Sequence, residues 1–360
     1  MKPITRALVL LSTTLVLPIV VCAQDETWIA RLDFSGDLRL RYEEIRRETE
    51  ATESRARYRA RFGMSTHLSD NVEFVVGIAS GAHNPVSRNI TIDGDYADAG
   101  IGINLLYIDW TPVEGMHVYA GKMKNPLFRA GEISLVWDGD LNLKGIALAY
   151  SKGLFFGTVG SFLVEERSSS SDSILLAGQV GAKWGIGEHS TLAAGVGYFG
   201  YSNTIGNKPF YHDEPKGNTV DLLGNYVYAY KDTELFAQFD TKIGNLPLSL
   251  FVNSARNNEV DQQDNGIAYG AKLGSAQDIG QWEIRWAYHD IEADALIGTF
   301  NDSDFGGGGT DANGHIFKAK YVISENVYVG GTLFINQINP YSLPEEGYER
   351  LQLDVVFKFE

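Results

Sequence analysis

The sequence predicts an all-β chain that closes as a transmembrane antiparallel β-barrel of about 16 strands. Three observations predict this fold. Segments of about 9 to 14 residues alternate apolar and polar side chains, which is the period of a strand with one apolar face. Short and long connections alternate between these segments, and no apolar run reaches the roughly 20 residues that a spanning helix needs.

The composition narrows the class of protein further. The chain has 360 residues, 12% aromatic side chains, one cysteine and a formal net charge of -16. These values exclude a disordered chain and a disulfide scaffold. The acidic balance argues against nucleic acid as a partner.

The first residues have the form of an export signal. Lys2 and Arg6 precede the apolar run 7–21, which is too short and too interrupted to span a membrane as a helix. We expect cleavage after Ala23, so that residues 1–23 are a signal peptide and residues 24–360 form a single barrel domain. A retained anchor helix is an alternative, and so is a lipoprotein site at Cys22, although Val21 does not suit acylation.

Strands are expected wherever the alternation is strict. The clearest segments are 37–42, 55–62, 234–239, 281–286 and 350–355. The last strand should continue to the C-terminus with five apolar side chains on one face. Outer-membrane barrels commonly end in an aromatic residue, whereas here Phe359 is followed by Glu360.

The connections predict the topology. Seven short turns are expected near 68–71, 112–115, 151–153, 185–189, 244–247, 277–280 and 324–326. Eight long loops are expected near 47–53, 81–99, 124–140, 166–172, 203–231, 257–264, 292–312 and 338–347. Bacterial outer-membrane barrels have short periplasmic turns and long extracellular loops, so both termini should be periplasmic. A soluble sandwich or propeller is the alternative, but the chain shows no blade-length repeat.

Arginines stand at every second position of two expected neighbouring strands: Arg39, Arg41, Arg55, Arg57, Arg59 and Arg61. An arginine that faces the bilayer midplane costs about 2–4 kcal/mol, so these side chains should line the lumen. The pattern favours a basic wall at a constriction that biases solutes by charge. A solvated polar face that only keeps the lumen wet is the alternative.

Loop 124–140 is expected to supply the opposing charge. It is too long for a tight turn and rich in apolar residues, so it should pack either inside the lumen or on neighbouring outer loops. The candidates for the constriction are Lys122, Lys124, Arg129, Glu132, Asp138 and Asp140. The three basic residues would extend the arginine wall, and the acidic residues would face it.

No other chemistry is indicated. The seven histidines form no metal-type pair, and no nucleophile or phosphate-binding motif is present, so we expect no catalytic residue, metal or cofactor. Asp302, Asp304 and Asp311 flank a glycine run in a long outer loop. A solvated acidic loop is the expected interpretation there, ahead of a calcium site.

Several stretches resemble the "putative porin" family of Gram-negative bacteria. They are 36–42 with Arg55, Arg57 and Arg61, and the segments 121–128, 135–142, 144–147 and 246–251. The resemblance covers nearly the whole chain after the signal. It implies a porin-type barrel embedded in outer-membrane lipid and lipopolysaccharide, and it names no substrate. Other porins suggest a homotrimer.

The sequence therefore predicts a porin for passive diffusion of small hydrophilic solutes and ions, with the arginine wall biasing charge. Only a short segment precedes the first expected strand, which argues against an energised transporter with a plug domain. The second hypothesis is a closed structural or adhesive barrel that binds partners through its long outer loops.

Overall fold

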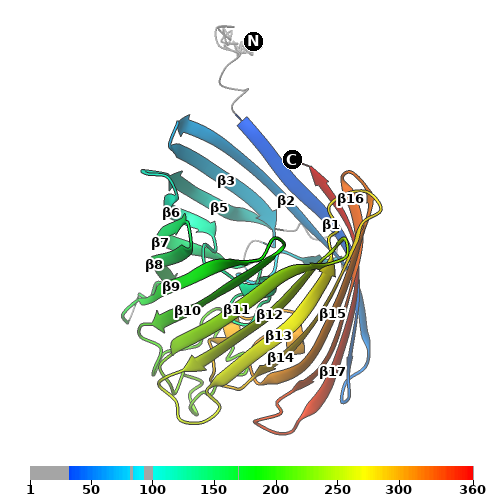
Figure 1. The fold of residues 1–360 in the computed structure, drawn as a ribbon. Coiled ribbons are helices and arrows are strands. Elements are labelled where there is room, and N and C mark those ends of the chain that lie inside the picture. The colour runs from blue at the N-terminus through cyan, green and yellow to red at the C-terminus, as the bar shows by residue number, and fades with distance from the viewer. Residues whose placement is uncertain (1–31, 82–83, 93–99, 169, 360) are drawn as a thin grey trace, which may run out of the picture.

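The computed structural model describes residues 32–81, 84–92, 100–168 and 170–359. The predicted signal peptide, residues 1–23, lies outside the described residues. Sixteen long strands form one antiparallel sheet in which β1 pairs with both β2 and β17, so the sheet closes into a barrel (Figure 1). The predicted fold class and strand number are confirmed.

The sheet follows the order of the chain. Its strands are β1 (Leu32–Arg47), β2 (Glu53–Ser69), β3 (Val72–Ser80), β5 (Ile101–Trp110), β6 (Met116–Lys124), β7 (Asn142–Lys152), β8 (Phe155–Glu165), β9 (Ser173–Ile186), β10 (Ser190–Tyr201), β11 (Lys231–Ile243), β12 (Leu246–Asn257), β13 (Asn265–Gly274), β14 (Trp282–Ile291), β15 (Ala312–Ser324), β16 (Val327–Ile338) and β17 (Glu346–Phe359). The two-residue β4 (Ile90–Thr91) pairs with β2 beyond the end of β3.

Alternation along each strand separates an outer and an inner face. On β1, Leu38, Leu40 and Tyr42 are more than 40% exposed, and the charged residues between them are mostly buried or half-buried. Side chains on a strand point alternately to opposite faces, so the apolar set covers the outside of the barrel and the charged set lies inside.

The start of β1 and the end of β17 lie at the end of the barrel that carries the short turns. Gly36 near the start of β1 pairs with Phe359 at the end of β17, and Leu32 pairs with Thr66 beside the β2–β3 turn. The long connections gather at the opposite end (Figure 1).

The hydrophobic core lies inside the barrel rather than between layers. Loops 125–141, 202–230 and 292–311 supply apolar side chains that pack on the inward faces of strands between β7 and β16. Three short 3₁₀ helices belong to these loops: η2 (Ala130–Glu132), η3 (Gly298–Phe300) and η4 (Phe305–Gly307). No helix among the described residues is long and apolar enough to cross a membrane.

Candidate functional site: a charged wall inside the barrel

The register of β1 and β2 places the six predicted arginines on one inner wall. Arg39 is the Cα partner of Arg59, and Arg41 is the Cα partner of Arg57. Arg61 is opposite Asp37 in the same register. Arg350 of the neighbouring β17 joins them, because it donates to the carboxylate of β1 that the β2 arginines also contact. We call these seven arginines the arginine patch: Arg39, Arg41, Arg55, Arg57, Arg59, Arg61 and Arg350.

Carboxylates inside the barrel neutralise most of the patch. Asp37 bridges Arg59 at 2.8 Å and Arg61 at 2.6 Å. Asp354 of β17 accepts two hydrogen bonds from the Arg41 guanidinium, at 2.7 and 2.8 Å. A fork that meets both carboxylate oxygens fixes the orientation of a guanidinium as well as its position.

Glu43 is shared by three arginines. Its carboxylate is fully buried and lies 2.6 Å from Arg350, 3.2 Å from Arg55 and 3.5 Å from Arg57. One negative charge therefore serves three guanidiniums. Arg55 also contacts Glu53, whose side chain is 55% exposed at the long-loop end of β2.

Loop 125–141 folds into the barrel and seats against the strands opposite its own. The backbone N–H of Gly131 donates to Gln238 of β11 at 2.8 Å, and that of Phe128 donates to Gln179 of β9 at 2.7 Å. Gly131 has φ +61°, and a Cβ there would lie 2.3 Å from the Phe251 ring of β12. The position where the loop packs against β12 therefore requires glycine.

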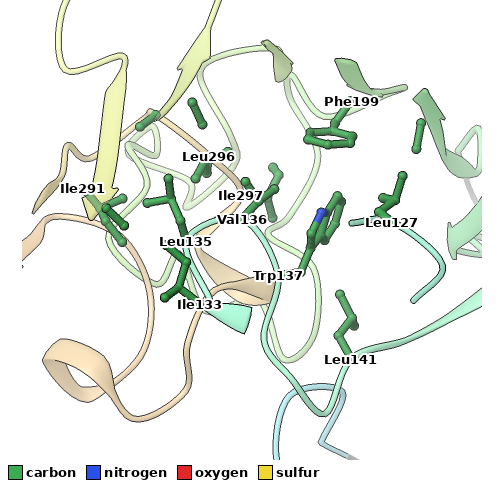
Figure 2. Packing of buried hydrophobic residues seen from close by; sticks show 14 of the residues in the cluster. Leu127, Ile133, Leu135, Val136, Trp137, Leu141, Phe199, Ile291, Leu296 and Ile297 are labelled. Carbon is green, nitrogen blue, oxygen red and sulfur yellow. The ribbon is translucent and has the colours of Figure 1, made fainter. Parts of the chain in front are cut away.

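Apolar side chains of this loop fill the interior beside the arginine patch. Leu135 and Trp137 are buried, and Figure 2 shows them packed near Leu296 and Ile297 of loop 292–311 and Phe199 of β10. The sequence left open whether the loop enters the lumen or rests on outer loops. In the structure it enters the lumen, because its apolar residues are buried against inward-facing strand residues.

Loop 292–311 also enters the barrel and supplies a carboxylate to the patch. Asp304 lies 2.8 Å from Arg350 and 3.2 Å from Arg41, and it accepts a hydrogen bond from Gln352. Burial alone would raise the pKa of the Asp304 carboxyl, but Arg350 and Arg41 hold that pKa well below its ordinary value. Asp304 is thus an ionised member of the wall and not part of the solvated acidic loop expected from the sequence.

A second pair of carboxyl groups marks the junction of the two inward loops. Asp138 accepts a hydrogen bond from the Ser303 backbone N–H at 2.9 Å, and Asp302 accepts one from the Asp304 backbone N–H at 2.9 Å. Burial raises the pKa of both carboxyl groups, and Asp302 raises that of Asp138 further. Neither carboxyl group takes part in an ion pair among the described residues.

The residues predicted for the constriction loop differ in whether they contact the arginine patch. Asp140 meets the arginine patch, at 3.4 Å from Arg61 and 3.6 Å from Arg59. Glu132 instead pairs with Arg285 of β14 at 3.1 Å. Arg129 donates to the Trp137 carbonyl within its own loop, at 3.4 Å.

Lys122 and Lys124 do not join the patch. They alternate along β6 with Met123, which is buried in the interior cluster, so the two lysines occupy the outward face of the strand. Lys122 is the Cα partner of Lys144 on β7, which also alternates with buried, inward-facing residues. The structure therefore does not place the lysines where the sequence analysis expected them.

Arg39 is the least compensated member of the patch. It donates to the Asn89 side chain of the connection 81–100 at 2.5 Å, and no ion pair among the described residues includes it. Seven guanidiniums inside the barrel face five carboxylates that are no more than 20% exposed: Asp37, Glu43, Asp140, Asp304 and Asp354. The wall keeps an excess of positive charge.

Besides Asp140, two contributors to this wall come from connections between strands. Asp304 reaches it only because a long loop folds inward, and Asn89 only because its connection turns back against β2, where β4 pairs. The residues around neither position form a pattern that would predict contact with the wall. Within the described residues, no group of three histidine, cysteine or acidic side chains is arranged to hold a metal ion.

A closed barrel with a charged inner wall and a loop seated inside it defines a porin-type channel of the bacterial outer membrane. The family model described as "Putative porin" matches residues 45–219 and 212–359. The chain belongs to this family, which confirms the resemblance seen in the sequence.

Solved porins share the fold at low sequence identity. Pseudomonas putida OprB superposes with a TM-score of 0.63 at 12% identity, covering 92% of this chain and 95% of OprB. Salmonella typhi OmpF, in complex with daunomycin, gives 0.57 at 10% identity, with 91% and 97% covered. A triple mutant of the Rhodopseudomonas blastica porin gives 0.53 at 14%, with 91% and 100% covered. No curated protein matches the sequence significantly.

Proposed function

We propose that this porin lets small hydrophilic solutes and ions diffuse passively across the outer membrane, and that the arginine patch favours anions. The observation that carries the proposal is the excess positive charge of the inner wall, with Arg39 bound to an amide and not to a carboxylate. A charged wall in a narrow aqueous passage raises the local concentration of ions of the opposite sign. No cofactor or energy source is required for diffusion down a gradient.

A closed barrel that binds partners through its outer loops is the second candidate. It is favoured by the same wall, since most of its arginines are ion-paired, and by the two loops inside the barrel. Side-chain pairs and loops could together obstruct the passage.

Single-channel recording of the folded protein in a planar bilayer under a salt gradient separates the two candidates. For the porin, we expect steady conductance steps and a zero-current potential whose sign indicates preference for anions. A zero-current potential that indicates preference for cations would mean that the overall negative charge of the chain dominates. That result would contradict the proposed anion preference. A folded, heat-modifiable barrel without conductance would support the closed barrel.

The lengths of the connections support a proposed orientation of the barrel in the membrane. We propose that the short turns and both chain ends face the periplasm and that the long loops face outward, as is usual for such barrels. Protease added to intact cells should cut only in the long loops. We further propose that residues 1–23 are removed as a signal peptide, which N-terminal sequencing of the purified barrel would test.

The outward lysines suggest how the barrel meets its surroundings. Lys122 and Lys144 are Cα partners near the long-loop ends of β6 and β7, on the outward face of the barrel. We propose that they contact lipopolysaccharide phosphates, because a charged side chain costs least near the interface. We also propose a homotrimer, to be tested by the mass of the barrel in detergent.

A further inference from the structure

A cavity of about 360 Å³ lies at the long-loop end of the barrel, beside the arginine patch. Its walls come from β1, β2 and β17, from residues 50–51 and 84–87, and from loops 202–230 and 292–311. Arg55, Arg57 and Arg350 line it together with Asp304, so the cavity opens directly onto the patch. Its volume lies near the lower end of the range for small-molecule sites, which suits a solute of monosaccharide size.

The cavity is polarised from its inner end to its rim. The inner end holds guanidiniums with little exposed surface, since the Arg350 side chain is 3% exposed and that of Arg57 is 13% exposed. The acidic residues Glu50 and Glu53 are 62% and 55% exposed, so water screens their charges. Three guanidiniums and one largely buried carboxylate, Asp304, line the inner end, so a negative group on a solute is attracted there.

The guanidiniums at this end have hydrogen-bonding capacity to spare. Each guanidinium carries five N–H donors. Arg57 makes only long contacts, at 3.5 Å to Glu43 and 3.3 Å to the Asn89 carbonyl. Glu43 is shared with Arg55 and Arg350, as described above. A carboxylate on a solute would supply the acceptors that a single glutamate cannot.

The remaining lining includes neutral hydrogen-bonding groups, two more cations and a few apolar side chains. One of the cations, Arg47, pairs with Glu50 at 3.5 Å. Asn84, Ser87, Thr299, Ser303 and Tyr211 present amide and hydroxyl groups, and Lys216 adds an ammonium from loop 202–230. Such groups suit the hydroxyls of a solute rather than an apolar body.

The loop walls of the cavity are firmly packed against one another. Asn218 donates to the carbonyls of Ala293 and Leu296 at 2.8 and 2.7 Å, and Gly298 donates back to the Asn218 side chain. A Cβ at Gly298 would lie 2.0 Å from the Lys216 carbonyl oxygen. The Lys216 backbone is thus fixed beside the cavity. Its ammonium pairs with Glu214 at 2.5 Å, so replacing the side chain removes that ion pair and leaves the backbone contacts of the wall in place.

We propose that this cavity binds a small hydroxylated carboxylate, the chemistry of a sugar acid, before it passes the arginine patch. The carboxylate would lie at the Arg55–Arg57 end and the hydroxyls against the neutral lining. The proposal rests on the proposed diffusion function, because it names the solute class for the same passage.

The test compares two probes that differ in one group. Galacturonate and galactose share a ring, but one carries a carboxylate where the other carries a hydroxymethyl group. Titration calorimetry on the folded barrel in neutral detergent at low ionic strength should show galacturonate binding at least tenfold more tightly than galactose. Equal affinity, or no binding of either sugar, would overturn the proposal.

Two variants and a third probe sharpen the test. Lys216→Gln should weaken galacturonate binding at least threefold. Lys208→Gln removes a lysine of the same loop that does not line the cavity, and it should leave binding unchanged. Equal losses in both variants would contradict a local site. Inorganic phosphate that binds as tightly as galacturonate would show an anion site without hydroxyl recognition, and would also overturn the proposal.

Conductance keeps this proposal distinct from the proposed function. A conducting, anion-selective channel that does not bind galacturonate refutes the cavity alone. A barrel that binds galacturonate with the expected discrimination but carries no current refutes the diffusion function alone.

Discussion

Replacing Arg39 by glutamine removes one positive charge from the arginine patch and breaks no ion pair among the described residues. The variant therefore tests charge selectivity without releasing a buried carboxylate. Arg46→Gln is a matched control, because Arg46 lies on the outward face of the same strand with a side chain that is 62% exposed.

The expected size of the effect follows from Coulomb's law. A unit charge acts on an ion 4 Å away in water with about 1 kcal/mol. Salt at 0.1 M, with a Debye length of about 10 Å, reduces this to about 0.7 kcal/mol. That energy changes the partition of each ion about threefold, in opposite directions for anions and cations. The anion-to-cation permeability ratio should therefore fall by up to about tenfold.

The assay is the zero-current potential in a planar bilayer under a tenfold salt gradient. Arg39→Gln should move the potential toward cation preference, and raising the salt on both sides should shrink the shift. Arg46→Gln should leave the potential unchanged. An unmoved potential for Arg39→Gln, or an equal shift for both variants, would refute the assignment of selectivity to the patch.

Three further changes have defined outcomes. Gly131→Ala should destabilise the packing of loop 125–141 inside the barrel by about 2 kcal/mol. The new Cβ would meet an aromatic ring, and the backbone at this position is left-handed. Limited proteolysis would then cut this loop faster than in the wild type, and an unchanged rate would contradict this packing. Asp302→Asn should raise the unfolding temperature at pH 8 more than at pH 4. The folded pKa of Asp302 lies above its unfolded value, so the folded state binds more protons and loses stability as pH rises between those two values. Equal changes at both pH values would exclude this cause. The pair Lys122→Gln and Lys144→Gln should lower the unfolding temperature in lipopolysaccharide-containing vesicles but not in neutral detergent, and equal loss in both media would argue against phosphate contacts.

The alternation of the strands predicted most of the wall. A period of two along β1 and β2 fixes which side chains share a face, and the cost of arginine in lipid fixes which face is inside. Arg41 and Arg57 could be expected as neighbours for this reason, and the register makes them Cα partners. The same rule, applied through Met123, places Lys122 and Lys124 outside, so their closeness to the loop along the chain is the weaker guide to their position.

The partners of the wall could not be predicted from the sequence. Asp304 and Asp140 reach it from two different loops, and their positions depend on how apolar loop residues such as Trp137 and Leu296 pack inside the barrel. Loop packing of this kind has no sequence period. Arg350 alternates with the apolar side chains of the last strand, but its contact with Glu43 joins the last strand to the first and exists only once the barrel is closed.

That contact bears on how the barrel closes. The seam between β17 and β1 pairs apolar residues on its outer side, whereas on its inner side Arg350 meets Glu43 and Asp354 meets Arg41. A slip of one residue would turn Arg350 toward lipid, at a cost of about 2–4 kcal/mol near the midplane, and would leave Glu43 with one cation fewer. The charges therefore specify the register of the final strand. Backbone hydrogen bonds alone would form in many alignments, whereas these ion pairs form in one.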